Sequence, residues 1–288
     1  MIPAKFDYHR AASLEEAIAL LGSTAGARAL AGGHSLLPMM KLRLAEPAAL
    51  IDIGRLAELR GISRQGDRVR IGALTPHAEL AASPILLEDC PLLAEAAGKI
   101  ADPQVRNKGT IGGNVAHADP GSDLPAVLVA LGATLHLRGP QGPRQVQASE
   151  FFVDLLTTDL GEGELIVAVE APRLQPTTGT CYLKVEHPAS GYAICGAAAT
   201  VSLAPDGKCA GASLAFNGVA ATPVNAQAVA AALVGKVPDD GAIAAAVADH
   251  LAVADPLGDL HASGEYRVEL AKVYGRRALA RARDRARS

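Results

Sequence analysis

Apolar and polar positions along this chain repeat with two different periods, and the changes of period mark its elements. Near the N-terminus, Ser13 and Glu16 have the spacing of a capping box, and the apolar run behind them ends at Gly22. This pattern predicts a helix through Leu21, and the short run Ala27–Leu30 after it predicts a strand. The predicted β-α-β unit, about residues 1–54, also contains a helical turn at Met39–Leu44 and a strand at Leu50–Ile53.

The next region, residues 55–175, alternates strand and helix signals around one long segment without either period. That segment, Ala101–Ser122, is predicted to be irregular, and a loop of this length inside a compact domain is usually functional. The elements predicted around it are a strand at Val69–Ala73, a helix from Pro76 with Thr75 as its N-cap, helices at Pro91–Ile100 and Asp123–Leu131, and strands at Ala133–Leu137, Arg144–Val146 and Leu165–Glu170.

A proline-containing segment, Pro172–Gly179, is the best candidate for a linker between domains. Beyond it, residues 176–288 read as strands followed by helices, an order typical of an α+β domain. The predicted strands are Cys181–Val185, Ala193–Leu203 and Lys208–Phe216, and the predicted helices are Val224–Leu233, Asp240–Leu251 and Glu265–Ala282.

Two glycine-rich turns interrupt these elements and suggest a ligand. We call Ala31–Pro38 the first glycine motif and Thr110–Asn114 the second. Glycine adopts positive φ at little cost, so paired glycines can direct successive backbone N–H groups into one concavity. Such a concavity suits an anion, above all phosphate, and Ser35 and Thr110 add hydroxyl donors. Either turn alone is an ordinary loop, whereas the two together favour a dinucleotide site.

Composition and charge narrow the class of protein. Hydrophobic residues make up 49% of the 288, but no run reaches the roughly 18 apolar residues of a membrane span. The first residues lack the apolar region of a secretory signal, so a cytoplasmic location is expected. The net charge is −3, although residues 275–288 hold six arginines. Because aromatic residues total only 3%, a solvated helix end or a contact with an acidic partner subunit is favoured over nucleic-acid binding.

Motifs of several common chemistries are absent. The four cysteines, at positions 90, 181, 195 and 209, form no Cys-x-x-Cys pair and no close cluster with histidine, so no metal or iron–sulfur site is predicted in this chain. No Gly-x-Gly-x-x-Gly follows a strand, and Walker A, His-Glu-x-x-His and Gly-x-Ser-x-Gly sequences are missing.

The remaining acid–base candidates each have a plainer interpretation. Asp119 and Asp123 resemble paired carboxylates, but a turn and a helix N-cap account for both. His34 could be a base or a loop hydrogen-bonding group, and the Glu186-His187 pair has no obvious partner. No catalytic residue is therefore predicted, and this suits a protein whose cofactor supplies the chemistry.

In order along the chain, the first glycine motif, the segment Ala101–Arg106 and the second glycine motif resemble the FAD-binding medium subunits of molybdenum hydroxylases. These are the relatives of carbon monoxide dehydrogenase and xanthine dehydrogenase. The likeness runs from Phe6-Asp7-Tyr8 to Glu265-Tyr266-Arg267, nearly the whole chain. The resemblance implies an α+β fold: an FAD-binding domain of the PCMH type at residues 1–175, with subdomains at about 1–54 and 55–175, and a smaller α+β flavoprotein domain at 176–288.

The resemblance also implies which residues hold FAD. Two loops would bind the diphosphate and adjoining ribityl through backbone amides, and Asp123 would accept hydrogen bonds from the cofactor. Ile100 and Ala101 match positions near the flavin, Ile166 an apolar contact, Lys184 a basic residue close to the ring and Tyr192 an aromatic residue against it. The residues of the two loops are Arg28, Ala29, Leu30, Ala31, Gly32, Gly33, His34 and Ser35, and Thr110, Ile111, Gly112, Gly113 and Asn114.

By the same resemblance, the chain would be an electron-transfer subunit of an oxidoreductase complex. A large molybdenum–pterin subunit would oxidise the substrate, a small subunit with two [2Fe-2S] clusters would deliver electrons to this chain, and an external acceptor such as a quinone, NAD or oxygen would receive them. The usual assembly is a dimer of heterotrimers, a heterohexamer. The substrate pocket would lie in the large subunit, so carbon monoxide, an aldehyde and an N-heterocycle stay open. Two alternatives are a self-sufficient flavin oxidase or dehydrogenase and a scaffold subunit without cofactor.

Overall fold

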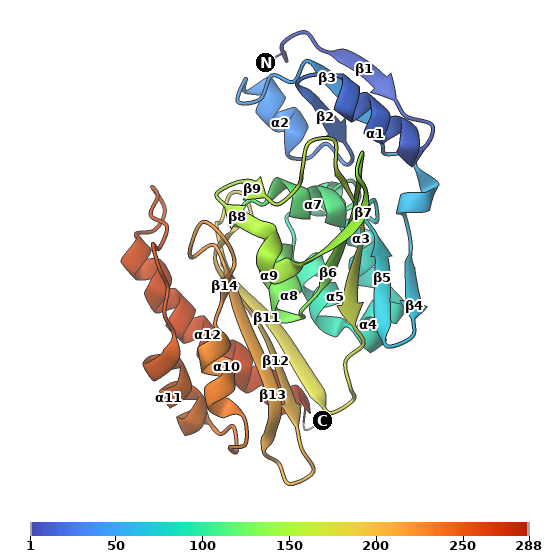
Figure 1. Ribbon diagram of the computed structural model, residues 1–288. Helices are drawn as coiled ribbons and strands as arrows, with labels where there is room; N and C mark the ends of the chain where they lie inside the picture. Colours follow the sequence, from blue (N-terminus) through green and yellow to red (C-terminus); the bar gives the residue numbers. More distant parts are fainter. Residues whose placement is uncertain (1, 287–288) are drawn as a thin grey trace.

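The computed structural model describes residues 2–286, whose main sheets form three parts in succession from the N-terminus, at the top of Figure 1. The first part is a parallel sheet in the order β1-β3-β2. Its strands are β1 (Asp7–Arg10), β2 (Ala27–Leu30) and β3 (Ala49–Asp52), and its helices are α1 (Leu14–Ser23) and α2 (Leu36–Lys41). The predicted capping box starts α1: the Ser13 hydroxyl accepts the N–H of Glu16, whose carboxylate accepts the N–H of Ala12.

The second part is an antiparallel sheet in the order β4-β5-β10-β6-β7. Its centre has the period of two typical of a sheet with one covered face: Val69 and Ile71 are buried in the core, while Arg70 between them pairs with Glu170. The sheet strands are β4 (Ile62–Gln65), β5 (Arg68–Gly72), β6 (Thr134–Gly139), β7 (Gly142–Gln147) and β10 (Leu165–Pro172).

Short helices pack against the apolar face of this sheet and form one hydrophobic core with it. They are α3 (His77–Ala82), α4 (Pro84–Asp89), α5 (Pro91–Gly98), α7 (Ile111–His117), α8 (Asp123–Ala130) and α9 (Ala148–Phe151). The one-turn helix α6 (Pro103–Arg106) has no buried residue. A 3-10 turn at Ala57–Leu59 and a small hairpin of β8 (Phe152–Asp154) and β9 (Thr157–Thr158) complete this part.

The third part is an antiparallel sheet, β11-β12-β13-β14, covered on both faces. Ala197 and Ala199 of β12 belong to the core shared with helix α12, whereas Ala198 belongs to the core around α8. Burial on both sides explains why this strand reads as an almost unbroken apolar run. The elements are β11 (Thr178–Glu186), β12 (Ala193–Leu203), β13 (Cys209–Asn217), β14 (Val224–Asn225), α10 (Gln227–Leu233), α11 (Asp240–His250) and α12 (Gly264–Ala286), the three helices lying together in Figure 1.

Four sequence-based predictions of local structure were wrong. The helix expected from Pro76 begins at His77 with Pro76 as N-cap, because the Thr75 side chain instead bonds both backbone groups of Gly61. The segment expected to be irregular, residues 101–122, contains α6 and α7. The helical turn expected at 39–44 is α2, which starts earlier, and residues 224–225 pair with β13 before α10 begins.

The arginines near the C-terminus are partly used within the chain. Arg283 is buried and pairs with Asp240 at 2.6 Å, and Arg285 pairs with Glu95 of α5 at 2.8 Å. These two therefore pack the end of α12 against its neighbours, contrary to the expectation of a merely solvated helix end; Arg287 lies outside the described residues. Within residues 2–286, no helix is both long and apolar enough to span a membrane.

Candidate functional site

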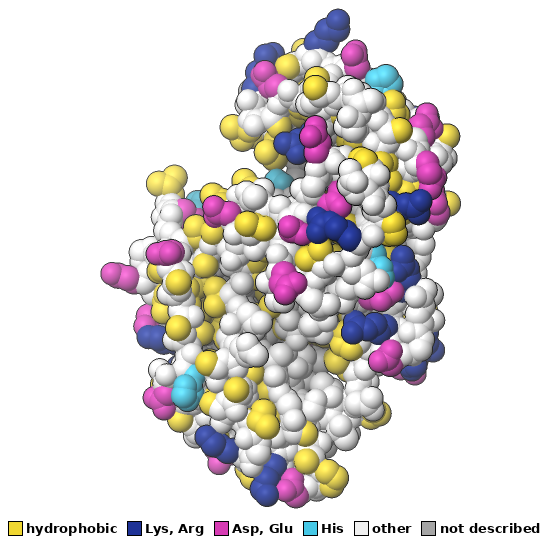
Figure 2. All heavy atoms as spheres, in the orientation of Figure 1, with side chains coloured by type: hydrophobic (Ala, Val, Ile, Leu, Met, Phe, Trp, Pro, Cys, Tyr) yellow, Lys and Arg dark blue, Asp and Glu magenta, His cyan; other side chains and the backbone are white. Residues whose placement is uncertain are grey.

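A cavity of about 1030 Å³ lies where the three parts of the molecule meet. The first part contributes β2 and the first glycine motif, the second contributes α7, the start of α8 and the 156–166 region, and the third contributes residues 190–192. Figure 2 shows the surface indented between the N-terminal part, at the top, and the rest of the molecule. The volume is at the upper end of the range of about 300–1,000 Å³ for small-molecule and cofactor sites, as a dinucleotide would require.

The first glycine motif lines this cavity and contains backbone donors without an acceptor. Among the described residues, the N–H groups of positions 32–35 have no hydrogen-bond acceptor. Gly33 has φ of +75°, and Gly32 packs so closely on the backbone of Lys108 and Gly109 that a Cβ there would overlap it. The His34 ring turns back to the Gly32 carbonyl, with Nδ1 3.1 Å from its oxygen, so His34 acts as a loop hydrogen-bonding group.

The second glycine motif forms the N-cap and first turn of α7, and the amides of residues 111–114 already have acceptors. The N–H of Ile111 donates to Thr75, that of Gly112 to Ala73, and that of Gly113 to the Thr110 hydroxyl. The expectation that these amides are free donors was therefore wrong. At the cavity wall the motif instead contributes the backbone of Gly112 and Gly113, which have no Cβ atoms, and the side chain of Asn114. The Oδ1 of Asn114 accepts a hydrogen bond from the Ser122 hydroxyl. Ile111 is fully buried and does not line the cavity.

The segment before α8 is held in place by the C-terminal sheet. The N–H of Ala193 donates to the Gly121 carbonyl at 3.0 Å, and the N–H of Gly218 donates to the Pro120 carbonyl at 2.6 Å. Arg267, on α12, donates to the carbonyls of Ile194 and Gly218 at 2.6 Å each. These contacts fix the start of α8, where Asp123 lies, against the ends of β12 and β13.

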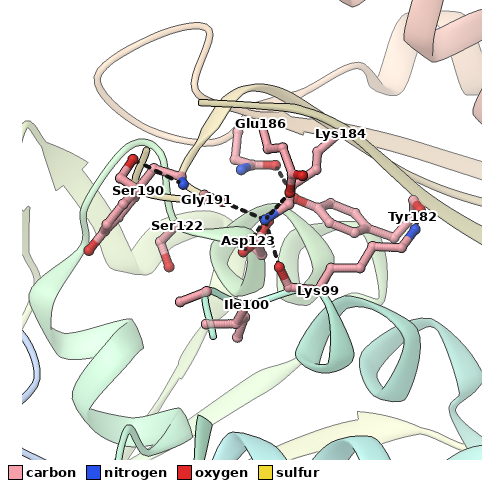
Figure 3. A network of polar contacts seen from close by, with 12 residues as sticks. Lys99, Ile100, Ser122, Asp123, Tyr182, Lys184, Glu186, Ser190 and Gly191 are labelled. Atoms are coloured by element: carbon pink, nitrogen blue, oxygen red, sulfur yellow. Dashed lines mark hydrogen bonds and ion pairs between the residues drawn. The ribbon is translucent and has the colours of Figure 1, made fainter. Parts of the chain in front are cut away.

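Asp123 is buried at the cavity wall and bound by two side chains of β11 (Figure 3). The Tyr182 hydroxyl donates to Oδ1 at 2.5 Å, and the Lys184 ammonium lies 3.2 Å from Oδ1 and 3.3 Å from Oδ2. Burial raises the Asp123 pKa to about 6, although both partners act to lower it. The helix-cap role expected for Asp123 was wrong, since Ser122 occupies the N-cap. Asp119 accepts the N–H of Gly121, so it forms the expected turn.

Lys184 lies behind Asp123 and does not line the cavity. Its ammonium donates to the carbonyls of Lys99 and Gly191 at 2.7 and 2.6 Å, so with Asp123 all three of its hydrogens have acceptors. Lys184 thereby anchors two cavity-lining segments, residues 100–101 and 190–192. Tyr192 lines the cavity and interacts with the Ser35 hydroxyl, and burial raises its pKa above the usual value.

The other expected site residues also lie on the cavity wall. Of the nineteen residues that the resemblance implies, only Ile111 and Lys184 do not line it. The site fits a dinucleotide, because the cavity is large enough and because free amides and glycine backbone line it. The diphosphate of a dinucleotide needs hydrogen-bond donors and a backbone that can approach it closely. The remaining wall residues among the nineteen are Arg28, Ala29, Leu30, Ala31, Ile100, Ala101, Thr110 and Ile166.

Comparison with known families decides the identity. The family model for the FAD binding domain in molybdopterin dehydrogenase matches residues 4–174, more than half of the chain, and the model for the CO dehydrogenase flavoprotein C-terminal domain matches residues 180–282. The chain belongs to the FAD-binding medium subunits of the molybdenum hydroxylases. The resemblance found in the sequence, the α+β fold class and the FAD cofactor are thereby confirmed.

Individual relatives are similar to this chain over nearly their whole length. The carbon monoxide dehydrogenase medium chain of Hydrogenophaga pseudoflava is 43% identical over 97% of both chains. The structure of reconstituted CO dehydrogenase from Oligotropha carboxidovorans matches with a TM-score of 0.96 and 42% identity, covering 99% of this chain and 100% of that one. The structure of quinoline 2-oxidoreductase from Pseudomonas putida 86 matches with a TM-score of 0.94 and 33% identity over 100% of both chains. This medium subunit is thus a component of a molybdenum-containing dehydrogenase complex, an oxidoreductase.

Sequence reasoning missed three residues of this medium subunit that belong to the site or its support. His77 lines the cavity and is almost fully buried, and its Nδ1 has no partner among the described residues. Tyr182 and Asn217 stand behind Asp123. Nothing in the one-dimensional pattern marks them, since His77 stands in an ordinary helix start and Tyr182 in an apolar strand. Only the tertiary contacts bring them to the site.

Because His77 is buried, we expect it to lower the free energy of unfolding as the pH falls. Burial, together with the positive charge of Arg106, lowers the His77 pKa from 6.5 to about 4. Below pH 6.5 the unfolded chain takes up a proton that the folded chain refuses, so His77 should cost about 2 kcal/mol of stability between about pH 7 and pH 5. Urea unfolding of the apoprotein at both pH values should show this cost as a difference between the wild type and His77→Leu.

The pH dependence of the wild type alone does not isolate His77, because Asp123 changes the stability of the folded state in the opposite direction over the same pH range. Its raised pKa stabilises the folded state as the pH falls through about 6. Replacing the exposed His250 by Gln is the matched control and should leave the wild-type pH dependence unchanged. If His77→Leu has the same pH dependence as the wild type, His77 is not held neutral.

The four cysteines of this medium subunit are all buried and free. Burial raises the pKa of Cys90 and of Cys195 to about 12 and that of Cys181 to about 11. Metal ligation and nucleophilic attack both use the thiolate, so these groups are poorly suited to either. Among residues 2–286, no group of three or more His, Cys, Asp or Glu side chains could hold a metal ion.

Proposed function

We propose that this medium subunit carries electrons from the [2Fe-2S] clusters of a partner subunit to an external acceptor. The observation that carries the proposal is the row of free N–H groups at residues 32–35, which lines a dinucleotide-sized cavity in a chain of an FAD-binding family. Bound FAD would supply redox chemistry that accepts and releases electrons, and the chain would supply its binding and orientation.

Within this proposal, the first glycine motif binds the diphosphate through its amides. The second motif gives the diphosphate room, because Gly113 has no side chain and its surface faces Ala31, whose Cβ would lie 3.8 Å from a Cβ at Gly113. Asp123 accepts hydrogen bonds from the cofactor, and Ile100, Ala101, Ile166 and Tyr192 surround the flavin. Lys184 acts through Asp123 and the two carbonyls that it holds.

We further propose that the partners are a large molybdenum–pterin subunit and a small [2Fe-2S] subunit, in a dimer of heterotrimers. The relative from carbon monoxide dehydrogenase is a medium chain, which supports a larger and a smaller partner subunit. Because carbon monoxide dehydrogenase and quinoline 2-oxidoreductase contain chains with the same fold, this subunit does not determine the substrate. The substrate is chosen by the large subunit.

The alternative of a self-sufficient flavin enzyme required a base beside the flavin, and its two candidates lie elsewhere. Neither Glu186 nor His187 lines the cavity. The His187 ring packs on His261 with centroids 4.2 Å apart, and its Nδ1 faces the N–H of Ala189. The positions of these side chains favour electron transfer over substrate oxidation in this chain.

The test is the route by which the bound FAD is reduced. The full-length chain loaded with FAD should show no loss of the visible flavin band when it is mixed anaerobically with substrate candidates. Adding the reduced [2Fe-2S] subunit should bleach the band, because that subunit supplies the electrons. Bleaching by a substrate without any partner would contradict the proposal and support the self-sufficient enzyme.

A further inference from the structure

The contacts behind Asp123 point to residues that act on the cofactor site without touching the cavity. Tyr182 is fully buried in the core between β11 and α8, yet its hydroxyl reaches the Asp123 carboxylate at 2.5 Å (Figure 3). Neither Tyr182 nor Asn217, which lies 3.2 Å from the same hydroxyl, lines the cavity. Both belong to the C-terminal sheet, whereas Asp123 belongs to the FAD-binding domain.

The hydroxyl of Tyr182 has one proton, and the shorter contact shows that Asp123 receives it. Its oxygen can then accept from the Asn217 amide if Nδ2 faces the hydroxyl. That orientation also gives a partner to Nδ2, which otherwise is a buried polar atom without one among the described residues. The order of atoms in an amide is assigned from such networks. A chain of donors thus runs from Asn217 through Tyr182 to Asp123.

The backbone leaves room for this chain of donors at Gly196. Gly196 lies directly opposite both Lys184 and Asn217 in the strand register. A Cβ at Gly196 would overlap the side-chain amide of Asn217 and come within 2.5 Å of the Tyr182 hydroxyl oxygen. The absence of a side chain at this point in the centre of the sheet therefore permits the contact.

We propose that Tyr182 and Asn217 are positioning residues, which hold the Asp123 carboxylate in one orientation at the cavity wall so that it can accept hydrogen bonds from FAD. Through them the C-terminal sheet sets how tightly the other domain holds the cofactor. The inference rests on the assignment of Asp123 to the FAD site made above.

The charged and titratable groups around Asp123 determine the sign of the effect. Asp123 faces Lys184 and Tyr182 of β11. The charge of Lys99, at the end of α5, also acts on Asp123, and Tyr192 approaches it from the loop after β11. Glu186 lies 4.0 Å from the Lys184 ammonium. The Tyr182 hydrogen bond lowers the Asp123 pKa. Its loss should therefore move protonation of Asp123, and the accompanying loss of FAD affinity, to higher pH.

The first experiment removes only the hydroxyl. The Tyr182→Phe variant keeps the ring in the core, and the dissociation constant of FAD from the full-length chain is measured by quenching of flavin fluorescence between about pH 5 and pH 8. We expect binding roughly tenfold weaker near neutral pH and a midpoint of the pH dependence about one unit higher. Thr200→Val is the matched control: it removes a buried hydroxyl contact to Ser213 in the same sheet and should leave the midpoint unchanged.

The second experiment separates this proposal from the site assignment. Asp123→Asn cannot titrate, so FAD binding should be weaker and nearly independent of pH, and adding Tyr182→Phe should then have no further effect on the pH dependence. If Asp123→Asn weakens binding but Tyr182→Phe leaves both affinity and midpoint unchanged, the positioning role is wrong and the FAD site stands. If Asp123→Asn binds FAD as tightly as the wild type, the site assignment itself is wrong.

Discussion

Replacing Gly113 by Asp is expected to abolish retention of FAD while leaving the chain folded. Gly113 is the third residue of α7, where an acidic side chain is favourable for the helix. A Cβ there would touch Ala31 only at 3.8 Å and the Thr110 hydroxyl at 3.0 Å, so the new side chain points between the two glycine motifs. A carboxylate about 5 Å from a phosphate costs about 3 kcal/mol at an effective dielectric constant of 20, or roughly a hundredfold in affinity.

Gly113→Asn is the matched control, because it has nearly the same volume without the charge. Equilibrium binding of FAD to both variants, together with thermal unfolding of the apoproteins, distinguishes charge from bulk. We expect Gly113→Asn to bind more tightly than Gly113→Asp, with similar melting temperatures for the two. Unchanged FAD binding by Gly113→Asp would contradict the placement of the diphosphate between the two motifs.

Gly32→Ala is expected to weaken both the fold and FAD binding. A Cβ at Gly32 would overlap the Lys108 carbonyl oxygen and approach the Cα of Gly109 to 2.9 Å. Both neighbours are backbone, so the contact can be relieved only by moving the first motif away from Lys108 and Gly109, the residues directly before the second motif. Overpacking of this kind costs about 1–3 kcal/mol, and the movement would misplace the free N–H groups of the first motif.

Urea unfolding gives the loss of stability, and ultrafiltration of the loaded protein gives the loss of FAD. Gly211→Ala serves as the control, since a Cβ at Gly211 meets nothing within 4 Å and its φ is not positive. Wild-type stability and FAD retention in Gly32→Ala would show that the two motifs are not held together by this backbone contact.

Secondary structure was predicted correctly from the sequence where a local pattern, such as a capping box, also forms in the folded chain. The start of α1 was correct because the capping box forms as its spacing indicates, and the strand Ala27–Leu30 was correct because this short run pairs with β3 over all four residues. β1 was missed because its four residues are exposed, so that the pattern carries no signal, and its pairing to β3 alone defines it. The second glycine motif was taken for a turn because glycine is a poor helix former. Its helix starts from Thr110, whose hydroxyl accepts the N–H of Gly113, and Gly112 packs so closely on Ala73 that a Cβ there would clash.

The site was predictable to the extent that it depends on residues next to one another in the chain. The first glycine motif is contiguous, and it lines the cavity as expected. Asp123 was found through the family resemblance, but its environment was not, because Tyr182 and Lys184 reach it from a strand about sixty residues away. Whether a backbone amide is free also depends on the fold. The amides of residues 32–35 in the first motif have no acceptor among the described residues, whereas those of residues 111–114 in the second do, although the two motifs look alike in sequence.

The burial of the four native thiols has a practical consequence for spectroscopy of the complex. The thiolate is the nucleophile that attacks a thiol reagent, so buried cysteines with raised pKa values should react slowly with a maleimide or a methanethiosulfonate. Leu260 is fully exposed, and a cysteine introduced there would be the fastest-reacting thiol. A spin label or fluorophore could then be attached at Leu260→Cys in the otherwise native chain. Its distance to the [2Fe-2S] clusters that we propose for a partner subunit would measure how the two subunits are oriented.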